Sequence, residues 1–137
     1  KYSTFAENDS LYNTPPVFAI YMVNKTLHWI KKQGGAEVLA KHNQEKAKII
    51  YDAIDNSQGF YIGHAQKPYR SLMNITFNLA DKNLEKEFLA TAKEKGFIGI
   101  AGHRLVGGCR ASTYNAVTLE ACKELAKYMQ EFQNMHK

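Results

Sequence analysis

The most constraining feature of this sequence is an alternating run near its middle, Leu72–Leu79 (LMNITFNL). Polar side chains separate the apolar ones, which stand at Met73, Ile75, Phe77 and Leu79. Because successive side chains of a strand point to opposite faces, this period of two predicts a strand that buries one face. Such a strand needs neighbouring strands and an apolar layer that covers the buried face.

Segments with helical periodicity lie on both sides of this strand. We predict helices over residues 15–33, 36–55 and 81–95, and a long helix that follows Thr118. Their apolar residues recur every three or four positions, as one inward face of a helix requires. The expected inward residues are Val17, Ile20, Tyr21, Leu27 and Ile30 in the first helix, and Leu39, Ala47, Ile50 and Ile54 in the second.

Capping and stop residues support these helix boundaries. Thr14 precedes Pro15, so its hydroxyl is expected to cap the first helix while the proline takes the first helical position. Asp81 and Thr118 precede the later helices in the same way. Glycines at 34–35 and 96 follow two of the predicted helix ends, where a left-handed residue is common.

Three more short strands are predicted, at residues 60–63 (FYIG), 97–101 (FIGIA) and 109–112 (CRAS). The last two are expected to form a hairpin. Helices and strands in this number and order predict an α+β fold of two layers, with the helices packed on one face of a small, mostly antiparallel sheet.

Size and charge exclude several classes of protein. A chain of 137 residues that is 45% hydrophobic can bury the core of one domain. No apolar run is long enough to cross a membrane and no signal pattern opens the chain, so we expect a soluble, cytoplasmic protein. The net charge is +5, but lysines alternate with acidic residues at helical spacing, which argues against a nucleic-acid partner.

The two cysteines do not predict a metal site. Cys109 and Cys122 lie far apart in the sequence, and no paired His or Cys accompanies either of them. We expect both to be reduced thiols and Cys109 to be a small buried apolar residue.

The segment Gly102–Ser112 (GHRLVGGCRAS) holds two of the three arginines of the chain. Its glycines allow a tight turn around a small ligand. Arginine suits bidentate recognition of a carboxylate or phosphate, so Arg104 and Arg110, with His103, could bind two anionic ends of one small metabolite. Structural salt bridges at both arginines, with the glycines as simple turn residues, are the alternative, and the pattern alone leaves both open.

Four segments in order resemble motifs of the phosphoserine aminotransferase family, which are class V, fold-type I enzymes that use pyridoxal phosphate. GHRLVGGCRASTYNAVT resembles the family signature GHRSVGGxRASxYNA, and the other segments are LYNTPPVFAIYM, IDNSQGFY and RSLMNITF. The resemblance extends from Ser10 to His136. It implies that residues 1–137 are the small C-terminal domain of such an enzyme, with a bridging helix at about 15–33 that joins it to a large domain.

The resemblance also implies roles for particular residues. Residues matching His103 and Arg104 contact the substrate phosphate, and the arginine matching Arg110 holds the α-carboxylate. Residues matching Asn13 and Thr14 reach the phosphate of pyridoxal phosphate in the neighbouring subunit of a homodimer. The sequence has Leu105 where the family often has serine and Cys109 where an aliphatic residue is usual, and neither is an expected ligand contact.

The catalytic lysine that forms a Schiff base with the cofactor lies, in the family, upstream of the segment matching Asn13. None of the lysines here stands in a matching context, so we assign no catalytic residue in this chain and read its lysines as surface charges. By resemblance, the full-length enzyme transfers the amino group of glutamate to 3-phosphohydroxypyruvate and forms phosphoserine in serine biosynthesis. The isolated chain is expected to be inactive.

Two other functions remain open at this point. The chain could be a non-catalytic anion-binding module, since it lacks a cofactor lysine. It could also belong to another class V aminotransferase, such as the serine– or alanine–glyoxylate type, although the His103–Arg104 pair argues for a phosphorylated substrate.

Overall fold

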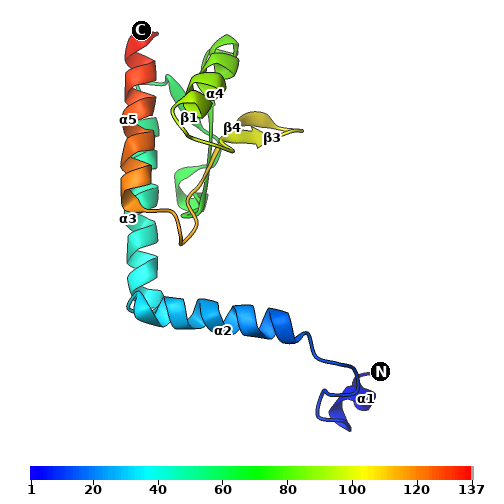
Figure 1. The fold of residues 1–137 in the computed structure, drawn as a ribbon. Helices are drawn as coiled ribbons and strands as arrows, with labels where there is room; N and C mark the ends of the chain where they lie inside the picture. Colours follow the sequence, from blue (N-terminus) through cyan, green and yellow to red (C-terminus); the bar gives the residue numbers. More distant parts are fainter. Residues whose placement is uncertain (137) are drawn as a thin grey trace. The chain divides into compact units, whose positions relative to one another are not determined.

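The computed structural model describes residues 1–136, which divide into two compact units, Lys1–Val38 and the chain from Leu39 onward. The first unit contains α1 (Tyr2–Ala6) and α2 (Val17–Lys32), drawn in blue in Figure 1. α3 (Ala36–Asp55) leads into the second unit. Among the described residues, no helix is long and apolar enough to cross a membrane.

The start of α2 differs from the prediction. The helix begins at Val17 with Pro16 as its N-cap residue, and no side chain caps it, so the predicted Thr14 cap is wrong. Thr14 precedes two prolines, and a residue before proline is held out of the helical region. The predicted stop is confirmed, because Gly34 and Gly35 have φ of 96° and 91° and the Gly35 N–H donates to Ile30 O at 3.0 Å.

The predicted inward face of α2 is also not buried. Val17, Ile20, Tyr21 and Leu27 are exposed, Ile30 is half-buried, and the helix has no buried residue. The periodicity identifies an apolar stripe, but no element in Lys1–Val38 covers it.

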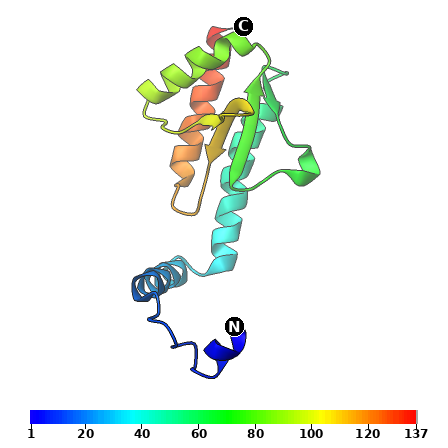
Figure 2. The same ribbon diagram turned by 90° about the vertical axis from the view of Figure 1, so that its right-hand side faces the viewer.

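The second unit has the predicted α+β fold. Four strands form an antiparallel sheet in the order β1-β2-β4-β3, and their bounds are Tyr61–Gly63 (β1), Asn74–Leu79 (β2), Ala101–His103 (β3) and Gly107–Ser112 (β4). α3 and α5 (Leu119–Met135) lie behind the sheet in Figure 2, and α4 (Glu85–Glu94) packs into the same core through Phe88 and Ala92. Two short 3₁₀ helices, Lys67–Tyr69 (η1) and Lys82–Leu84 (η2), lie in the connections.

The core lies between this sheet and the three helices. On β2 the side chains of Ile75, Phe77 and Leu79 are buried, whereas the alternate ones are only half-buried, as the period of two predicted. The strand begins at Asn74 rather than Leu72, and Met73, also expected on the buried face, precedes it and is half-buried. The four expected inward residues of α3 are all buried. Phe88 of α4 is fully buried at the centre, with ring centroids 5.1 Å from Phe132 on α5. The alternate side chains of β2, which are Asn74, Thr76 and Asn78, point to the other face of the sheet.

Two helix caps are confirmed. The Asp81 carboxylate accepts from the Asn83 N–H at 2.9 Å, although it caps η2 and α4 follows. The Thr118 hydroxyl oxygen accepts from the Ala121 N–H at 3.2 Å and caps α5. Both match the prediction that a short polar side chain precedes these helices.

One predicted strand is displaced. The expected strand at residues 97–101 is irregular, and the partner of β4 is instead β3, which starts at Ala101. Gly99 has a φ of 79°, which is incompatible with a regular strand, and Ile98 is exposed. The hairpin itself is confirmed.

Candidate anion-binding site

The β3–β4 hairpin depends on its glycines. Gly107 and Gly108 have φ of 75° and 69°, in the left-handed region that favours glycine. A Cβ at Gly102 would clash with the carbonyl oxygen of Gly107 on the facing strand. The Val106 N–H donates to His103 O at 2.9 Å and closes the turn. The sequence prediction of a tight turn at these positions is therefore confirmed.

A cavity of about 210 Å³ lies beside this hairpin, over the polar face of the sheet. The polar side chains that line it are His64, Thr76, Asn78, His103 and Arg110. None of the residues that line it is acidic. Donors and cations therefore face one small space, which suits a small anion.

Arg110 extends from β4 into this cavity. Its backbone N–H donates to Ile100 O at 2.6 Å and its strand partner is Thr76 on β2, so the sheet fixes its position. The side chain is half-buried, and its Nε is buried without a hydrogen-bond partner in the described chain. Within residues 1–136 no carboxylate pairs with Arg110 or Arg104, so the salt-bridge alternative is not supported for either.

His103 and Arg104 are neighbours in the sequence, but only His103 lines the cavity. His103 is exposed at the end of β3 and lines the cavity, whereas Arg104 is exposed in the turn and does not line it. The Leu105 N–H donates to His103 Nδ1 at 3.3 Å. When the ring is neutral, this contact places the proton on Nε2, which is then a free donor. The structure thus brings together two of the three predicted anion ligands.

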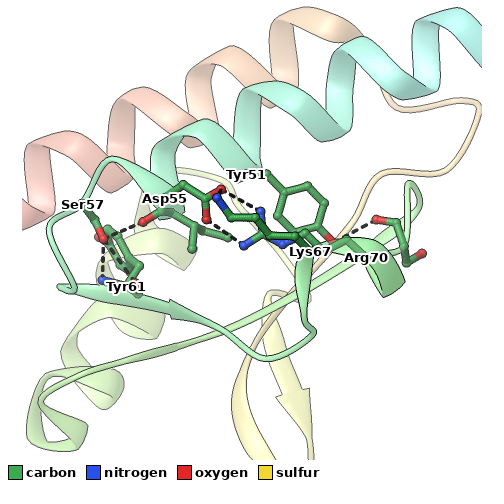
Figure 3. Close-up of polar contacts among 8 residues, drawn as sticks. Tyr51, Asp55, Ser57, Tyr61, Lys67 and Arg70 are labelled. Carbon is green, nitrogen blue, oxygen red and sulfur yellow. Dashed lines mark hydrogen bonds and ion pairs between the residues drawn. The ribbon is translucent and has the colours of Figure 1, made fainter.

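Arg70, the third arginine, has a structural role. It donates to both oxygens of Asp55 at 2.8 and 2.7 Å and stacks on the Tyr51 ring at 4.4 Å (Figure 3). Lys67 lies 3.3 Å from the same carboxylate. The Arg70 guanidinium lowers the pKa of Asp55 below its ordinary value. This cluster holds the connection between β1 and β2 against α3.

Lys46 is a buried lysine, so the reading of every lysine as a surface charge is wrong. It is 3% exposed, and its Nζ donates to the carbonyl oxygens of Thr113, Tyr114 and Val117 at 2.8–3.0 Å. Burial lowers the pKa of Lys46. These carbonyls belong to the segment between β4 and α5, so Lys46 fixes the chain just after Arg110.

Asn13 and Thr14 lie in the first unit, between α1 and α2. Both side chains are exposed, and neither makes a hydrogen bond within residues 1–136. An amide N–H and a hydroxyl without internal partners are suitable donors for a phosphate oxygen. The residues present therefore fit the phosphate of a cofactor such as pyridoxal phosphate.

Cys109 is buried, as expected, and Cys122 is buried on α5. Burial raises the pKa of the Cys109 thiol to about 12 and also raises that of Cys122. A buried thiol with a raised pKa is held in its protonated form, and neither sulfur is exposed to a ligand in the described chain. Within the part of the chain that the structure describes, no group of three or more His, Cys, Asp or Glu residues could hold a metal ion.

Sequence reasoning missed three cavity residues: His64, Thr76 and Asn78. The alternation along β2 contained a usable signal, because Thr76 and Asn78 must share the face opposite the buried residues. His64 follows a three-residue strand and carries no local signal.

Comparisons with known proteins support one family. Residues 1–125 match the family described as aminotransferase class-V. The chain is 61% identical over 136 residues to a phosphoserine aminotransferase of Lysinibacillus sphaericus (strain C3-41). This match covers 99% of this chain and 38% of that relative. It is also 56% identical to a phosphoserine aminotransferase of Bacillus subtilis (strain 168), in a match that covers 97% of this chain and 37% of that relative.

Solved structures give the same result. The chain superposes on a phosphoserine aminotransferase from Bacillus circulans subsp. alkalophilus with a TM-score of 0.92 and 52% identity, covering 99% of this chain and 38% of that one. A phosphoserine aminotransferase from Trichomonas vaginalis, solved with bound PLP, gives a TM-score of 0.83 and 36% identity over 94% of this chain and 37% of that one. The chain therefore spans less than two fifths of the length of these relatives.

Proposed function

Since the chain belongs to the class-V aminotransferase family, we propose that it is the small C-terminal domain and bridging helix of a phosphoserine aminotransferase. Relatives of that name at 56–61% identity support the proposal. The large domain would be the part of those relatives that the chain does not cover. We expect the whole enzyme to be a cytoplasmic homodimer that acts in serine biosynthesis.

The whole enzyme would transfer the amino group of glutamate to 3-phosphohydroxypyruvate and release 2-oxoglutarate and phosphoserine. Pyridoxal phosphate, when bound, supplies the electron sink and carries the amino group between the two substrates. In this chain Asn13 and Thr14 would donate hydrogen bonds to the cofactor phosphate across the dimer interface. Their exposed and internally unpaired donors support this role.

The observation that carries the proposal is the guanidinium of Arg110, which has no partner within residues 1–136. It is half-buried, fixed by the sheet, and faces a cavity without an acidic lining residue. Binding of an anion to a half-buried, unpaired guanidinium is favourable. The α-carboxylate is the anionic group common to every substrate of the proposed reaction. Arg110 would therefore hold each substrate in turn.

His103 and Arg104 would bind the phosphate at the other end of the substrate. His103 lines the cavity from β3, which pairs with β4 on the edge opposite β2, and its Nε2 would donate to the phosphate. Arg104 is exposed at the turn and would reach a phosphate group at the mouth of the cavity. These residues would let the enzyme discriminate between phosphorylated substrates and glutamate.

The test is Arg110→Ala in the full-length enzyme. We expect kcat/KM for both glutamate and phosphoserine to fall by the equivalent of about 2–4 kcal/mol, because an α-carboxylate is then left without its partner. Arg104→Ala should mainly affect phosphoserine. Normal kinetics of the Arg110 variant with both substrates would refute the proposed function.

A further inference from the structure

His64, Thr76 and Arg110 form one row across three neighbouring strands. The His64 N–H donates to Thr76 O at 3.1 Å and so continues the β1–β2 ladder, and Thr76 pairs with Arg110 on β4. Two strand spacings separate the backbones of His64 and Arg110, a span of about 10 Å. Thr76 stands between them.

The three side chains of this row lie on the same side of the sheet. The preceding row contains Phe77 and Cys109, both buried against the helices. Because side chains alternate between faces, Thr76 and Arg110 point away from the helices. His64, Thr76 and Arg110 accordingly all line the cavity described above.

The environment of His64 leaves its imidazole available to a ligand. The side chain is exposed and makes no hydrogen bond within residues 1–136. Among the described residues, no acidic side chain lines the cavity to compete for it. The Asp55 carboxylate at the end of α3 is bound by Arg70 and Lys67. A carboxylate that binds Arg110 above Thr76 would therefore meet the His64 imidazole on its opposite side.

We propose that His64 is a further substrate-binding residue, which donates a hydrogen bond to the carboxylate held by Arg110. The inference rests on the proposed function, because it takes the α-carboxylate as the ligand of Arg110. It differs from the role of His103, since a residue at the carboxylate end contacts glutamate and phosphorylated substrates alike. His64 would orient the carboxylate between two strands rather than distinguish the substrates.

The test compares three variants of the full-length enzyme. His64→Ala should raise KM about tenfold for both glutamate and phosphoserine, within the range of a hydrogen bond to a charged group. His64→Gln keeps a donor of similar reach and should recover most of the loss. His42→Ala removes an exposed histidine on α3 that does not line the cavity, and should behave as the unaltered enzyme.

A binding measurement supplements the kinetics. The imidazole NMR signals of His64 should shift on addition of glutamate, whereas those of His42 should not. An unchanged KM in His64→Ala, or a loss confined to phosphoserine, would overturn the inference. Arg110→Ala separates the two levels of the argument: if it is impaired with both substrates while His64→Ala is normal, the inference fails and the proposed function stands.

Discussion

Replacement of Lys46 by methionine tests whether the buried ammonium stabilises the fold. Methionine keeps most of the apolar stem, so the change mainly removes the three donors to Thr113 O, Tyr114 O and Val117 O. A hydrogen bond to a charged group is worth about 1.5–3 kcal/mol net, and the loss of three is partly offset because the ammonium is no longer desolvated. Two of the bonds are only partly buried, so water can replace them. We therefore expect a loss of about 2–4 kcal/mol.

The assay is urea unfolding followed by far-UV circular dichroism, which reports on α3 and α5. Tryptophan fluorescence is unsuitable, because the single tryptophan, Trp29, lies on α2 in the other unit. Lys48→Met is the matched control, since Lys48 lies on the same helix with its side chain 73% exposed. A free energy of unfolding for Lys46→Met within about 0.5 kcal/mol of this control would refute the reasoning.

Three further predictions concern pH, thiols and the hairpin. Arg70 lowers the pKa of Asp55 below 3.8, so its stabilising effect should be complete above that pH and disappear as the pH falls through the folded value; Asp55→Asn should remove this acid dependence of urea unfolding. Cys109 and Cys122 should resist an aromatic disulfide reagent at neutral pH in the folded chain and both react in urea, and rapid labelling without urea would contradict their burial. Gly102→Ala should displace the hairpin and lower kcat/KM for phosphoserine by the equivalent of at least about 1 kcal/mol, and unaltered kinetics would show that the close approach to Gly107 is dispensable.

Features set by local periodicity were predictable from the sequence. The buried face of β2 and the inward residues of α3 followed directly from spacings of two and of three to four residues. The displaced β3 shows where this reasoning stops, because FIGIA has the composition of a strand and nothing in it reveals the left-handed φ of Gly99. The α2 stripe shows a second limit, since periodicity identifies an apolar face without identifying its cover.

The candidate site was only partly predictable for a similar reason. His103 and Arg110 lie in one motif and reach the same cavity, but Arg104, in the same motif, does not line it. His64 enters the cavity through pairing between strands that are distant in sequence, and this register cannot be read from its neighbours. Lys46 stands seven residues after Leu39 and four before Ile50, on the predicted inward face of α3, but a lysine at that position gives no sign of the carbonyl groups that bind it after β4.

The floor of the cavity, formed by β2 and β4, tolerates fewer substitutions than its rim at the tip of the β3–β4 hairpin. The floor belongs to β2 and β4, which pair with neighbours on both sides, so a change there would disturb the sheet. The rim ends in Leu105 and Val106, which are 83% and 66% exposed and contribute nothing to the core. If the cavity binds the substrate as proposed, substitutions at this tip should alter which anions it accepts, at little expense to folding, and directed evolution of substrate preference would best begin there.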